Sequence, residues 1–135
     1  EYGNPHILFS FFEKEVDGSL LAPLSCPEGT KIWIAARDED KMFADLDKMV
    51  EQLIKRCKGR KPHAVFHADC AGRGRFSFNR VLKDEIVRRM QYPLIQDMSV
   101  PWLGLYGFGE FARLGVKNRF HMYTTSLFVI LKKEE

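Results

Sequence analysis

Long hydrophobic runs are missing from this chain of 135 residues. No apolar stretch reaches the roughly 18 to 20 residues that a membrane-spanning helix needs, so we expect no membrane span and no membrane partner. The first residues, Glu1 to Asn4, lack a basic region followed by an apolar one, and we expect no secretory signal there. The sequence therefore predicts a soluble, cytoplasmic protein. Because the chain does not begin with Met, we also expect it to be part of a longer protein.

Cysteine is scarce too, with three residues at positions 26, 57 and 70. An odd number without CxxC spacing argues against a disulfide framework and against a zinc-binding pair, and it favours a reducing compartment. The four histidines show neither HxH nor HExxH spacing, so the sequence predicts no metal site.

A strong excess of charge is also absent, since 21 Lys and Arg face 18 Asp and Glu for a formal net charge of +3. That excess is too small to predict a nucleic-acid partner. The charges are nevertheless unevenly distributed: residues 1–54 hold 5 basic and 11 acidic side chains, whereas residues 55–89 hold 11 basic and 3 acidic ones. The basic block is either a solvated helix surface with a few loop arginines or a face for anions or an acidic partner.

What is present is typical of one globular domain spanning residues 1–135, with 45% hydrophobic and 29% charged residues. Apolar patterns between turn signals predict strands at residues 6–12, 19–22, 31–36, 64–70, 102–108 and 120–131, with a loop over 109–119. The pair Asp17-Gly18 predicts a hairpin between the first two strands.

Two helices are expected among these strands. Asp38 stands where an N-cap should, apolar residues then recur at helical spacing from Met42 to Leu53, and Gly59 supplies a stop. The second helix is expected from about Asn79 to Gln91, ended by Pro93. The order β-β-β-α-β-α-β-β predicts an α+β fold, in which two helices pack on a mixed, largely antiparallel sheet of about six strands.

Residues that could bind a ligand cluster in the segment from His67 to Asn79, where the predicted strand is followed by two glycines and then by the predicted helix. Gly72 and Gly74 allow close approach of the backbone, and Arg73 and Arg75 add positive charge, which suits a carboxylate or phosphate. The third glycine of a dinucleotide motif and the lysine of a P-loop are both missing. The alternative is that the glycines only turn the chain while the arginines pair with the acidic first half.

Three more side chains are candidates. Cys70 ends the same strand beside the arginines, which would favour a thiolate, and His67 or His121 could serve it as a base. An inert, buried cysteine is the other reading. Glu110 is a lone acid in a loop of glycines and aromatic residues, where it either caps backbone N–H groups or binds a ligand ammonium. His121 is either a structural residue or an axial haem ligand.

Three motifs occur in a fixed order: DCAGRGRFSF, VPWLGLYGFGEFARLG and RFHMYTTSL. Together they resemble the C-terminal FIST domain of F-box and intracellular signal transduction proteins, and the resemblance covers nearly the whole chain. Matched residue by residue, Cys70, Gly72, Arg73 and Gly74 belong to its first motif. Pro101, Gly104, Gly109 and Glu110 belong to the second, and His121 and Thr124 to the third. Many bacterial members continue the second motif with GEI-G/A-P, from which Phe111 to Leu114 depart.

The resemblance implies a sensory, ligand-binding and non-enzymatic module that works beside an N-terminal FIST domain. The ligand it implies is an amino acid or another small anion, with haem for nitric oxide sensing as an alternative. A substrate-recruiting module of the F-box type is a further alternative, and an enzyme using Cys70 is a third. The predicted ligand-binding residues are Cys70, Gly72, Arg73, Gly74, Arg75, Glu110, His121 and Thr124, with no certain cofactor.

Overall fold

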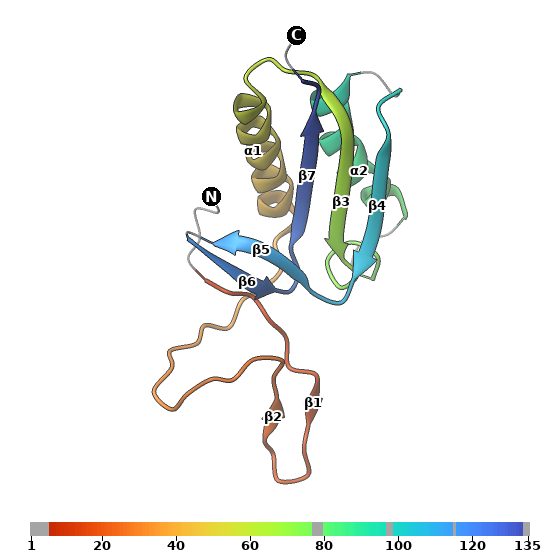
Figure 1. Cartoon of the computed structure of the whole chain (residues 1–135). Helices are drawn as coiled ribbons and strands as arrows, with labels where there is room; N and C mark the ends of the chain where they lie inside the picture. Colours follow the sequence, from red (N-terminus) through yellow and green to blue (C-terminus); the bar gives the residue numbers. More distant parts are fainter. Residues whose placement is uncertain (1–5, 77–79, 97–98, 115, 134–135) are drawn as a thin grey trace.

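A computed structural model describes residues 6–76, 80–96, 99–114 and 116–133. The elements in chain order are β1 (Glu13–Lys14), β2 (Leu20–Leu21), α1 (Glu39–Cys57), β3 (Pro62–Cys70), α2 (Arg80–Ile95), β4 (Trp102–Gly107), β5 (Glu110–Leu114), β6 (Lys117–His121) and β7 (Thr125–Leu131) (Figure 1). The α+β class with two helices and mixed strand pairing is confirmed. Within the described residues the strands form three small sheets, β1-β2, β4-β3-β7 and β5-β6.

The three-stranded sheet is the centre of the fold. Its middle strand β3 pairs in parallel with β4 and antiparallel with β7, and helix α2 makes the crossover that a parallel pair needs. Both helices cover the same face of this sheet, because Val50 of α1 and Met90 of α2 pack with Trp102 and Leu127 of the strands. Met90 is completely buried, which stabilises the fold by about 1.5–3 kcal/mol.

Helix α1 begins and ends as its sequence predicts. The Asp38 carboxylate accepts a hydrogen bond from the Lys41 amide at 3.0 Å, and two acids follow in the first turn, where the helix dipole favours them. The last turn closes at Lys58, whose left-handed backbone (φ 52°) lets its N–H reach the Lys55 carbonyl. Gly59 follows with φ 79°, so the predicted glycine stop is the second of two left-handed residues.

Helix α2 continues past the proline that was expected to end it. Pro93 lies inside the helix, near its C-terminal end, where a missing N–H costs only one backbone bond. Leu94 and Ile95 beyond it are both buried against Val65, and this burial favours continuing the helix. The predicted start at Asn79 lies outside the described residues.

The N-terminal part differs most from expectation. Residues 6–12 and 31–36 are not strands, because neither segment lies beside a strand of the central sheet with which it could pair. Only the short β1-β2 hairpin forms here, with the Asp17 carboxylate accepting from the Ser19 amide at the predicted turn. We call residues 6–37 the arm; Figure 1 shows it extending away from the central sheet.

The C-terminal part also corrects two predictions. The expected loop over 109–119 contains the β5-β6 hairpin, although residue 115 lies outside the described part. The expected strand over 120–131 is divided into β6 and β7 by a turn at Met122 to Thr124. The backbone of Tyr123 is left-handed there (φ 58°), because the chain turns at this point from β6, which pairs with β5, into β7, which pairs with β3.

Candidate functional site

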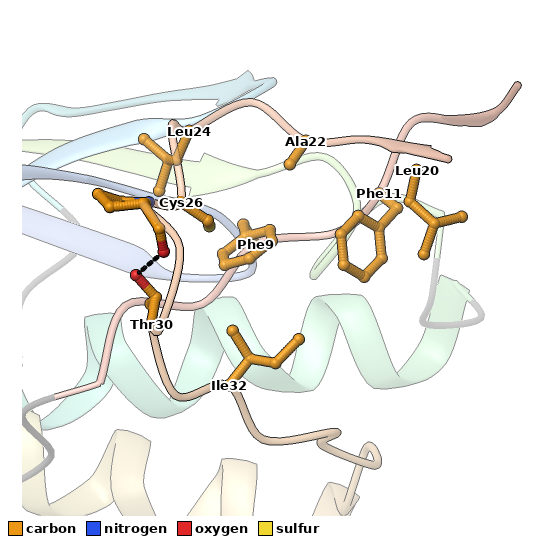
Figure 2. Close-up of a pocket in the computed structure, with 9 residues that line it drawn as sticks. Phe9, Phe11, Leu20, Ala22, Leu24, Cys26, Thr30 and Ile32 are labelled. Atoms are coloured by element: carbon orange, nitrogen blue, oxygen red, sulfur yellow. Dashed lines mark hydrogen bonds between the residues drawn. The ribbon is translucent and has the colours of Figure 1, made fainter. Parts of the chain in front are cut away.

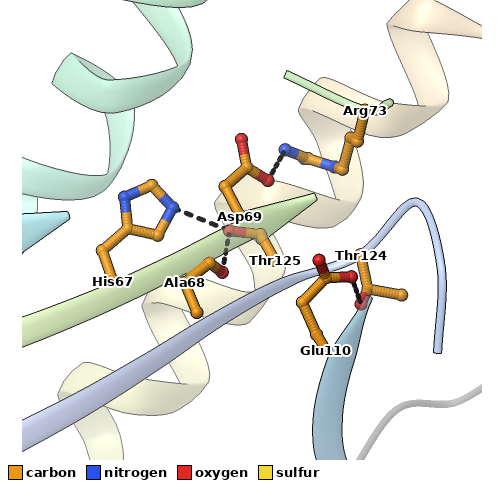
Figure 3. A network of polar contacts seen from close by, with 7 residues as sticks. All are labelled: His67, Ala68, Asp69, Arg73, Glu110, Thr124 and Thr125. Carbon is orange, nitrogen blue, oxygen red and sulfur yellow. Dashed lines mark hydrogen bonds and ion pairs between the residues drawn. The ribbon is translucent and has the colours of Figure 1, made fainter. Parts of the chain in front are cut away.

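Buried polar side chains gather where β3 and β4 end. The set comprises His67, Asp69, Arg73, Glu110, His121 and Thr125. The carboxyl ends of parallel strands meet at one edge of a sheet, and the β5-β6 hairpin follows β4 directly at that edge. The set divides into two networks, which Figure 3 shows side by side.

The first network runs along the helix-covered face of β3. His67 Nε2 lies 2.9 Å from Thr125 Oγ1, and the buried Asp69 carboxylate pairs with Arg73 at 3.2 Å. Burial lowers the pKa of His67 to about 4, with a smaller contribution from the Arg73 charge, so its imidazole is neutral. Burial also raises the pKa of Asp69 against the opposing effects of Arg73 and Thr125.

The glycines of the first motif allow this network to pack closely. A side-chain carbon at Gly74 would overlap Asp69 Oδ2 and stand 2.8 Å from Tyr106 Cε1. One at Gly72 would stand 3.0 Å from Tyr123 Cε1. The turn itself is closed by the Arg73 and Gly74 amides, which both donate to the Cys70 carbonyl. The close packing at Gly74 places the turn against Asp69, whose carboxylate pairs with Arg73.

The second network centres on Glu110, the first residue of β5. Its Oε2 accepts a hydrogen bond from the Thr124 hydroxyl at 3.0 Å. Its Oε1 is buried and has no hydrogen-bond partner among the described residues. Burial raises the pKa of Glu110 and the nearby Asp69 charge adds to this, whereas Thr124 and the Cys70 thiol oppose it.

His121 lies directly opposite Glu110 in the β5-β6 hairpin, and burial lowers the pKa of its imidazole. The site is tied to β3 through the backbone, since the Cys70 amide donates to the Thr124 carbonyl at 3.0 Å. The Ala71 amide likewise donates to the Gly107 carbonyl at the end of β4. Glu110 thus lies where three chain segments meet.

The fold brings together nearly all residues predicted from the sequence to bind a ligand. Cys70, Gly72, Arg73 and Gly74 form one turn, Glu110 begins the hairpin and His121 ends it, and Thr124 lies in the turn that follows. Arg75 is the exception, because it is exposed outside this cluster.

Sequence reasoning missed Asp69 and Thr125 as parts of the site. A signal was available for Asp69: with His67 it shares the period-2 positions of Val65, the buried face of a strand. Thr125 carried no comparable signal, because the break between β6 and β7 that aims it at His67 was not foreseen.

The sequence profile of the FIST C domain matches residues 6–113, most of the chain. The chain belongs to the FIST C domain family. This family is associated with signal transduction. No curated protein and no solved structure matches this FIST C domain. The profile match ends before His121 and Thr124, which join the site through the fold.

Two surface hollows are described, and neither includes Glu110 or His121. One, of about 400 Å³, lies within the arm between Phe9, Phe11 and Ile32 (Figure 2). Ligation of a haem by His121 stays a prediction, and we derive no chemistry through one.

Among the described residues, no group of three or more His, Cys, Asp and Glu side chains could hold a metal ion. No helix in the same part of the chain is both long and apolar enough to cross a membrane.

Replacing Gly74 by alanine tests the packing of the first network. We expect Gly74→Ala to lower the free energy of unfolding by about 1–3 kcal/mol, because the methyl group displaces Asp69 from Arg73. Gly104→Ala is the control, since its methyl would stand 3.7 Å from His67 Nδ1, an ordinary contact. Urea unfolding of both variants measures this; equal stability would contradict the assignment.

The neutral state of His67 predicts a pH dependence. With a pKa of about 4 when folded and 6.5 when unfolded, His67 takes up a proton mainly on unfolding within this window. Its contribution to stability is complete above pH 6.5 and is lost as the pH falls towards 4. Between pH 7 and pH 5 the wild type should lose about 2 kcal/mol more than His67→Gln in urea unfolding. Parallel losses would show that His67 titrates normally.

Proposed function

We propose that this FIST C domain is a non-enzymatic, cytoplasmic sensory domain that binds a small ligand with an ammonium group, such as an amino acid. The observation that carries the proposal is the Glu110 carboxylate, 4% exposed, with Oε1 lacking a hydrogen-bond partner among the described residues. An unsatisfied buried acceptor costs about 1–3 kcal/mol, and a charged one costs more. A ligand ammonium donating to Oε1 would offset that cost.

The surroundings of Glu110 favour a cation at this oxygen. Its Oε2 is already held by Thr124, and the Asp69 charge adds negative potential. Arg73 is engaged with Asp69 inside the protein, so its charge is not available to a ligand carboxylate. Because Arg75 is exposed outside the cluster, backbone N–H groups are the groups we assign to that carboxylate.

A route from the site to the arm supports a sensory role. Thr124 holds Glu110, and Tyr123 beside it covers Gly72. The next residue, Met122, donates its amide to the Leu8 carbonyl of the arm at 3.0 Å. A ligand that moves Glu110 would therefore act on the arm through three consecutive residues. We propose that the arm passes this change to an N-terminal FIST domain in the full-length protein.

The position of Cys70 supports the non-enzymatic part of the proposal. Its side chain is only 2% exposed, so a reaction at the thiol, like ligand binding at Glu110, requires movement of the surrounding turns. His67, one of the two candidate bases, directs Nε2 at Thr125. A nucleophilic thiol needs both access and a nearby base.

The arm favours a second candidate, a protein-interaction module of the substrate-recruiting type. Phe12, Trp33 and Ile34 are exposed by 58%, 67% and 102%, respectively, in a segment that leaves the central sheet. Such side chains gain most from burial against a protein partner. Partner capture that requires the arm but does not depend on Glu110 would favour this candidate.

The variant Glu110→Gln tests the leading proposal through two opposite effects. Without ligand it should be more stable than the wild type at pH 7 by about 1 kcal/mol, because the cost of burying the charge disappears. The raised pKa of Glu110 means that this cost is absent at acid pH and grows as the pH rises, so the difference should shrink near pH 4. The same variant should lose ligand binding.

Binding is measured by thermal shift with free amino acids and, as matched probes, their N-acetylated forms, which lack the ammonium. A ligand at 100 times its Kd should add about 2.7 kcal/mol to the wild type and nothing to Glu110→Gln. The exposed Glu51→Gln on α1 is the charge-matched control and should respond like the wild type. Equal shifts from acetylated forms, or an undiminished shift in Glu110→Gln, would contradict the proposal.

A further inference from the structure

One face of the central sheet is not covered by either helix. Side chains alternate along its strands, so Val65, Trp102 and Leu127 point to the helices and their neighbours point away. The large side chains that point away are all apolar and exposed. We call these five the open face: Phe66 (43% exposed), Leu103 (61%), Leu105 (61%), Phe128 (65%) and Ile130 (40%).

The strand register makes the open face continuous. Phe66 lies opposite Leu103 on one side and Phe128 on the other, with the rings of Phe66 and Phe128 6.3 Å apart. The next row along β3 has the small Ala68 at its centre, between Leu105 and Ser126. A ridge of three large side chains therefore runs beside a shallower row.

Neither the charge nor the size of the open face suits a surface left in water. It contains no ionisable side chain, although 29% of the chain is charged. Its apolar side chains expose on the order of 500 Å², as much as the largest apolar patch on a typical monomer, and such patches are often functional. Two such faces together would bury about 1,000 Å², the lower bound for a specific protein interface.

We propose that the open face is the interface of a homodimer in which two copies of this chain pack sheet against sheet. A two-fold axis places the ridge of one copy over the shallow row of the other. The same surface is therefore complementary to itself, as an interface between identical chains requires. The absence of charge removes the like-charge repulsion that opposes contact between identical surfaces. The arm of the same chain does not cover this face, because it extends away from the sheet (Figure 1).

Light scattering during size-exclusion chromatography tests the dimer. The wild type should elute at twice the mass of one chain and dissociate on dilution, as a small interface does. Phe128→Lys and Leu105→Lys should each elute at the mass of one chain, because each buries two charges between the sheets. Phe111→Lys is the matched control: this phenylalanine is 77% exposed on β5, outside the open face, and its variant should remain dimeric.

A wild type that remains monomeric up to millimolar concentration would overturn the proposal. So would dimers that survive both lysine variants, since the contact would then lie elsewhere, for instance in the arm. Circular dichroism verifies that each variant is folded. If the lysine variants do not fold, wild-type NMR spectra decide: concentration-dependent shifts should centre on Leu103, Leu105 and Phe128, and shifts confined to other residues would refute the dimer.

Discussion

The two polar networks and the arm all depend on contacts made by residues 122–125, which comprise the turn and the first residue of β7. Within four residues it bonds the arm through the Met122 amide, covers Gly72 with Tyr123, holds Glu110 with the Thr124 hydroxyl, and meets His67 with Thr125. Its left-handed residue, Tyr123, costs about 1 kcal/mol or more for a side chain of this size. The contacts on either side of Tyr123 compensate that strain, so the loss of any one of them would weaken the others.

Both networks bury ionisable groups at the end of β3, but they reach different electrostatic states. Asp69 has a full cationic partner in Arg73, and the neutral His67 adds no charge. Among the described residues Glu110 has no cationic partner, only neutral groups of Thr124 and Cys70, and its pKa is raised by burial. A folded protein retains such an unsatisfied carboxylate at a cost to stability, and carboxylates with perturbed pKa values are found most often at functional sites. The Asp69–Arg73 pair is therefore the structural half of the cluster, and Glu110 is the half we propose to bind a ligand.

Local signals predicted the helices and the central strands well. The N-cap at Asp38 and the strand over residues 64–70 depend on neighbours in sequence, and both were correct. Failures occurred where distant contacts decide the structure: Pro93 is tolerated because Leu94 and Ile95 are buried, and the division between β6 and β7 requires Leu8 and Cys70 as partners. The family match added what periodicity could not, by placing the turn from Cys70 to Gly74 and the glutamate at 110 in one pattern. The proximity of Asp69 and Thr125 to them came only from the fold.

We propose that Glu110 is a buried carboxylate whose unpaired oxygen a cationic ligand completes. The most direct measurement is the pKa of its side-chain carboxyl, followed by NMR in the protein with carbon-13 in its glutamates, with and without a bound amino acid. We expect a pKa above the ordinary 4.5 in the free domain and a fall once an ammonium lies against Oε1. A value at or below 4.5 in the free domain, unchanged by every ammonium-bearing ligand, would contradict it.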